Sequence, residues 1–337
     1  MKVMHIEEEL LNFLHDSIRE NDKKYRDIQL ILFFFGFRDE PWPTLEDAAI
    51  KFEVGESENR RSERPRQIIK NKFTSKVSLS ELPRVCEVAS IVESAECSTS
   101  DEIKEILLDK KLVPENFSIK GLLNLLQQLG LCRDFDIYTN KLLHASRASV
   151  ESEKNLYLLR ASKASEIKAA LKKLLVYPGL VGIASLRSFF EKHEAYLAYK
   201  RIFLDVLRSR DDVWISNVDG RYYYIVEERD NTLINNLEKI KNIADAVGVE
   251  KLSVVLLNAF KQRTPPKGNE YPSLELIGKY LKSSRFTEYN GNAVSLNVSP
   301  TPLRDIEKDV ARYMQDKGTI GFVGIKEFLE KKGYSKP

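Results

Sequence analysis

Only two short segments of this 337-residue chain carry the sequence signature of a β-hairpin, and the rest has the spacing of helices. Asp219-Gly220 and Asn290-Gly291 each lie between runs of β-forming residues, which is the strongest local signal for a two-residue hairpin turn. Elsewhere apolar residues recur every three or four positions, as on one face of a helix. The sequence therefore predicts a mainly α fold, with strands confined to hairpins near residues 213–226 and 285–297.

Length and helix spacing together predict several small domains, since a chain of this size suits roughly two to four of them. Helices followed by a hairpin are the layout of a winged helix, and this layout is predicted twice, over residues 149–228 and 229–298. A helix–turn–helix domain over residues 1–80 precedes them, with a helical domain over 81–148. A C-terminal helical pair is expected over 299–337. The predicted architecture is thus a tandem of helix–turn–helix and winged-helix modules with short β-hairpins.

The N-terminal domain contains a pair of short helices. Thr44 precedes the first one and Asp47 follows Thr44 by three residues, a spacing at which hydroxyl and carboxylate cap the first helical turn. Gly55 is placed to end this helix. Its apolar face consists of Leu45, Ala48, Ala49 and Phe52.

The second helix, over residues 62–72, turns a polar face outward. Pro65 cannot occupy a helix interior, so the helix is expected to begin close to Ser62 with Pro65 in its first turn. Between residues 56 and 76 there are seven basic and three acidic residues, a local excess larger than the net charge of +3 of the whole chain. A phosphate-contacting surface needs such a concentration of charge, although a run of charges can equally be a solvated helix face.

This helix pair resembles region four of sigma-70-class bacterial sigma factors, the module that reads the upstream promoter element. The resemblance covers roughly residues 10–80 and is fairly specific. The matching residues are Phe34-Phe35-Gly36-Phe37 at a turn, Thr44-Leu45-Glu46-Asp47 at a helix start, and Glu63, Arg64, Arg66, Gln67 and Ile68 in the second helix. It implies that the second helix is a recognition helix for the major groove of duplex DNA.

Two features depart from the sigma pattern. The segment GESENR is inserted where the family has a tight turn, and Ser62 and Pro65 replace an arginine and an isoleucine of the family. The sigma regions that bind the polymerase clamp and melt the upstream DNA have no visible counterpart. Promoter specificity and the role of a complete initiation factor are therefore not carried over.

The resemblance and the chemistry of the side chains together assign roles on this surface. Arg66 and Gln67 are expected to read base edges, because arginine pairs with guanine and glutamine with adenine, and Glu63 can accept a hydrogen bond from cytosine. Ser62 stands where the family has an arginine. Contacts to DNA phosphates are expected from Arg60, Arg61, Arg64, Lys70 and Lys72.

The order of the segments resembles a second group of bacterial proteins, in which a sigma region-four-like module precedes several winged-helix units, some of them called HARE-type. This resemblance rests on layout, and it implies tandem DNA-binding modules without catalysis. In the winged-helix layout predicted above, Arg221 at the tip of the first hairpin and the Tyr222–Tyr224 run could contact the DNA backbone as a wing. Alternatively, the aromatic strand 222–224 packs on the helices of its own module.

Sequence motifs typical of catalysis or metal binding are missing. The chain has neither the G-x-x-x-x-G-K-[ST] nor the G-x-G-x-x-G phosphate loop, and it has no G-x-S-x-G elbow and no H-E-x-x-H pair. The few histidines and cysteines do not have metal-ligand spacing. They are His5, His15, His144, His193, Cys86, Cys97 and Cys132. We therefore expect a protein that is not an enzyme and has no cofactor and no metal site.

Membrane and export signals are missing as well. The start MKVMHIEEELLNFL is acidic and amphipathic, unlike a signal peptide, and no apolar run approaches membrane-spanning length. The cysteine pattern suits a reducing cytoplasm. We expect a cytoplasmic regulator of transcription that binds double-stranded DNA. The alternative is a protein-interaction scaffold or accessory subunit, bound to RNA polymerase or part of a phage-defence system, which the near-neutral charge of residues 78–337 favours.

Overall fold

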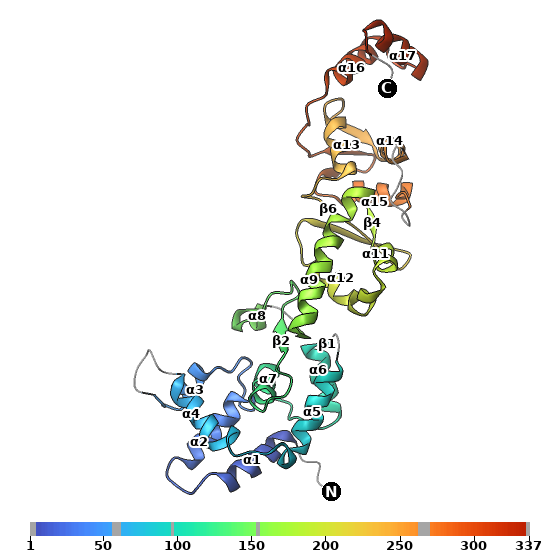
Figure 1. Cartoon of the computed structure of the whole chain (residues 1–337). Helices are drawn as coiled ribbons and strands as arrows, with labels where there is room; N and C mark the ends of the chain where they lie inside the picture. Colours follow the sequence, from blue (N-terminus) through green and yellow to red (C-terminus); the bar gives the residue numbers. More distant parts are fainter. Residues whose placement is uncertain (1–4, 56–61, 96–97, 153–155, 262–269, 335–337) are drawn as a thin grey trace. The chain divides into compact units, whose positions relative to one another are not determined.

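Helices form most of the described chain, and its strands belong to three small three-stranded antiparallel sheets (Figure 1). This computed structural model describes residues 5–55, 62–95, 98–152, 156–261 and 270–334. The predicted mainly α fold with short β-hairpins is confirmed. No helix in these ranges is both long and apolar enough to cross a membrane.

The chain divides into two compact units. The first contains residues 1–169 and 198–209, and the second contains residues 170–197 and 210–337. Each unit has its own apolar core.

The first unit begins with four α-helices, which are followed by a π-helical turn and a 3-10 turn. The helices are α1 (Ile6–Ser17), α2 (Lys24–Phe34), α3 (Leu45–Lys51) and α4 (Glu63–Ile69). A π-helical turn, η2 (Lys70–Thr74), continues α4 directly, and a 3-10 turn, η3 (Leu79–Glu81), follows.

Residues 83–160 of the first unit, here called the first repeat, have the element order of a winged helix. The elements are α5 (Pro83–Ser94), β1 (Ser98–Thr99), α6 (Ser100–Asp109), α7 (Ile119–Gln128), β2 (Phe135–Tyr138) and β3 (Tyr157–Arg160), with α8 (Arg147–Ser152) between the last two strands. β3 pairs with β1 on one side and with β2 on the other, antiparallel in both cases.

This sheet corrects the expectation that strands occur only near residues 213–226 and 285–297. Its hairpin lacked a sequence signal because a long connection, residues 139–156, joins β2 to β3 in place of a two-residue turn. The expected domain boundary at 148 falls inside this connection. The expected boundary at 80 falls between helices that share one core.

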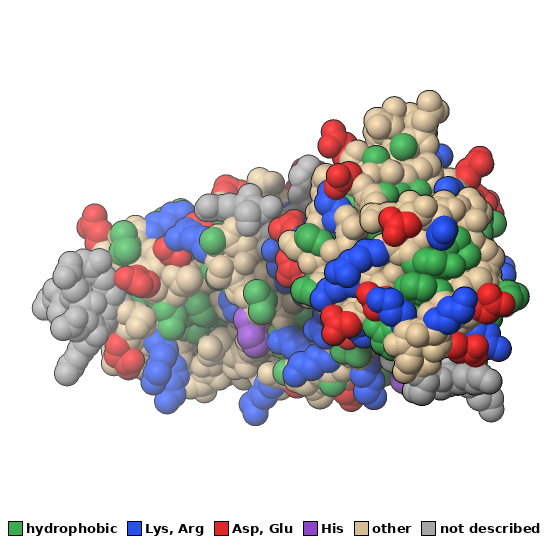
Figure 2. Space-filling view, turned by 90° about the horizontal axis from the view of Figure 1, so that it is seen from above, with side chains coloured by type: hydrophobic (Ala, Val, Ile, Leu, Met, Phe, Trp, Pro, Cys, Tyr) green, Lys and Arg blue, Asp and Glu red, His purple; other side chains and the backbone are tan. Residues whose placement is uncertain are grey.

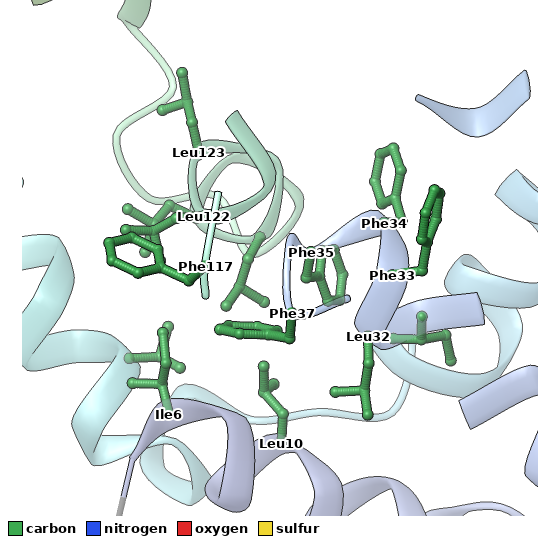
Figure 3. Packing of buried hydrophobic residues seen from close by; sticks show 14 of the residues in the cluster. Ile6, Leu10, Leu32, Phe33, Phe34, Phe35, Phe37, Phe117, Leu122 and Leu123 are labelled. Carbon is green, nitrogen blue, oxygen red and sulfur yellow. The ribbon is translucent and has the colours of Figure 1, made fainter. Parts of the chain in front are cut away.

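That shared core is built around the phenylalanine-rich end of α2. Phe37 lies between Ile6 and Leu10 of α1 and the side chain of Phe117, which precedes α7 (Figure 3). The cluster of buried residues runs from Ile6 to Leu158. The N-terminal helices and the first repeat are therefore packed around the same apolar side chains.

Two glycines let α7 approach the end of α2 closely. Gly36 has a φ of +84°, and a Cβ on Gly121 would lie only 2.3 Å from the Cα of Gly36. The Ser118 N–H donates to the Gly36 carbonyl (2.9 Å), and the Asn124 amide donates to the Phe34 carbonyl (3.3 Å). α7 is thus buried against the N-terminal helices along residues 121–126.

Residues 161–226, the second repeat, follow the same order and contribute to both units. The elements are α9 (Ala161–Val176), α10 (Pro178–Val181), β4 (Ala184–Ser185), α11 (Leu186–Lys192), the 3-10 turn η4 (Glu194–Tyr199), α12 (Lys200–Arg208), β5 (Val213–Val218) and β6 (Arg221–Val226). β6 lies between β4 and β5. The β5–β6 hairpin is the one predicted around Asp219-Gly220.

Residues 232–296, the third repeat, lie wholly in the second unit. The elements are α13 (Thr232–Lys241), β7 (Ala246–Gly248), α14 (Val249–Lys261), α15 (Leu274–Ser283), β8 (Thr287–Tyr289) and β9 (Ala293–Leu296). The predicted hairpin around Asn290-Gly291 joins β8 to β9, and Gly291 has the positive φ (+97°) that its turn requires.

Two further helices, α16 (Asp305–Lys317) and α17 (Phe322–Lys331), form the pair expected at the C-terminal end. The rings of Tyr313 and Phe328 stack at 4.0 Å between them. An ion pair of Lys239 with Glu307 (2.9 Å) holds α16 to α13. Neither helix has a buried residue, so polar contacts of this kind attach the pair.

Candidate nucleic-acid interface

The first helix of the candidate helix–turn–helix, α3, begins at the predicted cap. The Thr44 hydroxyl accepts from the backbone N–H of Asp47 (3.1 Å) and donates to the Asp47 carboxylate (2.7 Å). Arg147 of α8 also donates to this carboxylate (3.1 Å) and to Glu40 (2.9 Å). Arg147 therefore helps to fix the start of α3. Sequence reasoning missed this residue because it lies 100 positions after its partner.

α3 ends earlier than expected. Its last residue is Lys51, and the chain reverses at Glu53, which has a φ of +51°, two residues before the glycine that was expected to end the helix. The Val54 N–H then donates to the Ala49 carbonyl (3.0 Å). This earlier reversal buries Val54, and the ring of Phe52, the C-cap residue of α3, lies 5.8 Å from the ring of Phe33 on α2.

The second helix, α4, begins at Glu63 directly after Ser62, and Pro65 lies in its first turn, as the sequence predicts. Pro65, Ile68 and Ile69 are buried, and so is Phe73 in the π-helical turn that continues α4. The Phe73 ring contacts the ring of Phe35 at 5.2 Å. One side of the helix is thus fixed on the core.

The other side of α4 is exposed and polar. Arg64, Arg66, Gln67 and Lys70 are all exposed, with Arg66 68% accessible. The contacts among these side chains are long: Arg64 to Gln67 and Gln67 to Glu63 at 3.3 Å, and Arg66 to Glu63 at 3.7 Å. Exposed contacts of this kind contribute little free energy. The side chains can therefore exchange them for groups of a ligand.

Lys72 does not belong to this exposed face. Its ammonium group forms an ion pair with the carboxylate of Asp27 on α2, whose side chain is only 3% exposed. Arg26 also pairs with Asp27, at 2.8 Å. A buried carboxylate needs such partners because it has been removed from water. Lys72 therefore holds the turn after α4 on α2. The phosphate contact expected of Lys72 stays a prediction.

Arg60 and Arg61 lie outside the described residues, as does most of the inserted segment GESENR, and their roles stay predictions. Ser62 is exposed at the start of α4. The structure thus brings Ser62, Glu63, Arg64, Arg66, Gln67 and Lys70 together on one helix.

Arg221 lies in the second unit, at the start of β6, where it pairs in register with Val218. Its side chain is exposed. In the aromatic run that follows, Tyr224 is buried and its hydroxyl donates to the Leu174 carbonyl (2.9 Å). Burial raises the pKa of the Tyr224 hydroxyl. Tyr224 thus packs within its own module, as expected in the alternative in which the aromatic strand 222–224 packs on its own helices.

Within the part of the chain that the structure describes, no three His, Cys, Asp or Glu side chains lie close enough to hold a metal ion. The thiol of Cys132 is buried, and this burial raises its pKa to about 12, so it stays protonated. The exposed face of α4 offers hydrogen-bond donors and positive charge.

Comparison with protein families, with curated proteins and with solved structures finds no match for this chain. The resemblance to sigma region four and to tandem winged-helix proteins therefore stays a prediction from the residues and the order of the elements.

Proposed function

We propose that this chain is a sequence-specific DNA-binding protein, and a regulator of transcription, that inserts α4 into the major groove of duplex DNA. The supporting observation is the two-sidedness of α4. Its buried side, at Pro65, Ile68 and Ile69, fixes the helix on the core, and its other side carries exposed donors on neighbouring turns. A helix held in this way can present a fixed set of side chains to base edges.

The chemistry of the exposed residues indicates which of them contact DNA bases and which contact the DNA backbone. Arg66 and Gln67 pair with guanine and adenine, and Glu63 accepts from cytosine. Arg64 and Lys70 contact phosphates, together with Arg60 and Arg61 of the preceding segment. Residues 62–76 contain five basic residues and one acidic residue, so the surface attracts DNA before specific contacts form.

A second role, as a protein-interaction scaffold, is favoured for the three repeats. In a helix–turn–helix the second helix is the one that reads DNA. In the first repeat this helix is α7, which is covered by the end of α2. In the second repeat it is α12, where Arg201 pairs with Glu102 and Asp205 accepts from the Tyr157 hydroxyl. These helices are occupied by contacts within the first unit.

The third repeat has an apolar surface at the corresponding place. A groove between α14 and α15 is lined by Val254 (45% exposed), Leu274 (46% exposed) and the small residues Ser253 and Gly278. On the face shown in Figure 2, basic and acidic side chains both occur, with apolar side chains exposed between them. Exposed apolar surfaces of this kind suit a protein partner. The candidates are RNA polymerase and another protein of a phage-defence system.

Selection of bound duplexes from a random library, using the intact chain, tests the DNA-binding proposal. We expect enrichment of one motif containing guanine and adenine, which the variant Arg66→Ala no longer enriches. Arg312→Ala, which removes an exposed arginine of α16, serves as the matched control and should enrich the same motif. Recovery of unrelated sequences by the unaltered chain would exclude sequence-specific reading.

A further inference from the structure

A polar cavity of about 390 Å³ lies in the second unit, apart from the surface of α4. Its walls come from the second repeat, through β4, α11 and β6, and from the third repeat, through residues 270–276 at the start of α15. Ligand pockets commonly form where two modules meet, and this volume falls in the range of about 300–1,000 Å³ typical of small-molecule sites.

The local structure explains why polar side chains converge here. Arg221 and Tyr223 are two residues apart on β6 and so face the same side of the sheet. Ser185 of β4 pairs in register with Tyr223. Arg187 and Ser188 follow on the first turn of α11, and all five residues line the cavity.

The two arginines differ in their partners. The Arg187 Nε donates to Glu191 one turn further along α11 (2.7 Å), which orients the guanidinium group and leaves its terminal nitrogens for other acceptors. Arg221 is exposed, and its guanidinium has no ion pair within the described ranges of the chain. Two guanidinium groups therefore line one cavity, with donors available on both.

Hydroxyl groups complete the set of donors. Ser185 and Ser188 line the cavity from β4 and α11, and Ser273 lines it from the other side. The Ser273 oxygen accepts from the Leu276 N–H (3.1 Å) as the cap of α15, so its hydroxyl proton can be donated elsewhere. Guanidinium groups together with hydroxyl groups are the donors that phosphate oxygens accept from in proteins.

We propose that this cavity binds a phosphate ester of about the size of a mononucleotide. Arg187 and Arg221 hold the phosphate, and the ring of Tyr223 lies beside the base. This site is independent of the DNA-binding role of α4. Two carboxylates also line the cavity. Glu191 is paired with Arg187, and Glu270 opposes the phosphate charge and limits the affinity.

Calorimetric titration of the intact chain with adenosine monophosphate tests the proposal. We expect saturable binding that Arg221→Ala and Arg187→Ala each weaken about tenfold, since each removes a charge-assisted hydrogen bond. Glu270→Gln should tighten binding a few-fold, because it removes a like charge. Arg312→Ala is the control and should leave the affinity unchanged, because Arg312 is 74% exposed on α16. Thermal melting of each variant shows that it is folded.

A single-stranded oligothymidylate is titrated in parallel to identify the source of the phosphate. Binding of the nucleotide assigns the site to a free ligand. Binding of the oligonucleotide alone, weakened by Arg221→Ala, assigns the same phosphate contact to a nucleic-acid strand. If neither probe binds, or if both arginine variants bind as the unaltered chain does, the proposal is wrong. Arg66→Ala should not change these affinities, which separates this site from the proposed role of α4.

Discussion

At the scale of single residues, the exposed face of α4 separates side chains that can read bases from those that hold the backbone. Arg66→Ala or Gln67→Ala should lower affinity for the preferred duplex by about 1–3 kcal/mol and hardly change affinity for random duplexes, because each removes a base-edge contact. Lys70→Ala should weaken binding to all sequences alike, because a phosphate carries no sequence information. Fluorescence anisotropy with both duplexes measures this. Equal losses on both duplexes for every variant would indicate a non-specific electrostatic surface.

Lys72 lies in the same basic segment as Lys70, but its ion pair stabilises the folded chain. Lys72→Met should lower the free energy of unfolding by roughly 1–3 kcal/mol, because the buried Asp27 carboxylate loses one of its two cationic partners. Urea denaturation measures the loss. Lys70→Met is the matched control and should change stability by no more than about 0.5 kcal/mol, since Lys70 is exposed. Equal stability of the two variants would contradict the structural role given to Lys72.

Sequence reasoning succeeded at residues whose behaviour is set by near neighbours. Thr44 caps α3 through Asp47, three residues on, and Pro65 can only occupy the first turn of α4. It failed where the partner is remote in sequence. Lys72 pairs with Asp27, which is 45 residues away, and Arg147 donates to Asp47, which is 100 residues away. Nothing in the local pattern indicates either contact.

At the scale of elements, α7 can pack on the end of α2 because glycines, which have no side chain, lie at the closest approach, at residues 36 and 121. Gly121→Ala would place a Cβ 2.3 Å from the Gly36 Cα and 2.6 Å from the Phe35 carbonyl carbon, so the backbone must move. We expect a loss of about 1–3 kcal/mol or more in the free energy of unfolding, measured in urea. Gly321→Ala is the control, because a Cβ there meets nothing within 4 Å. An unchanged stability of Gly121→Ala would show that α2 and α7 do not pack as described.

The attachment of α16 should depend on pH. Hydrogen bonds from Arg304 and Lys239 lower the pKa of Glu307 from 4.5 to about 2. A lowered pKa means that the stabilisation is present above the ordinary value and is lost as pH falls from 4.5 through 2. Urea denaturation at neutral pH should therefore show Glu307→Gln to be less stable than the unaltered chain. The difference should vanish towards pH 2, and a difference independent of pH would contradict this assignment.

An element could be predicted from the sequence only where its local residue pattern was distinctive, as at a two-residue turn, or long enough to show a period. The β5–β6 and β8–β9 hairpins were predicted because Asp219-Gly220 and Asn290-Gly291 form tight turns. The β2–β3 pair was missed because its connection contains a helix. The first strand of each repeat has only two or three residues, too few for an alternating pattern, so three-stranded sheets were not foreseen.

At the scale of the whole molecule, the N-terminal helices are one part of the first unit. The carboxylate of Glu9 on α1 accepts from the backbone N–H groups of Arg84 (3.0 Å) and Val85 (3.1 Å) and so caps α5. Burial raises the pKa of Glu9, while these hydrogen bonds oppose the rise. A fragment ending at residue 80 would lose this cap and the shared core. DNA binding is therefore to be measured on the intact chain.

The salt dependence of binding to the selected duplex tests the central claim most directly. The observed affinity of the intact chain should fall steeply as salt rises, because bound cationic side chains release counterions from DNA. In the double variant Arg64→Ala/Lys70→Ala, the slope of log affinity against log salt should become less steep by about 2, one for each phosphate contact removed. An unchanged slope in this variant, or no binding of the unaltered chain at low salt, would contradict the proposal that α4 binds DNA.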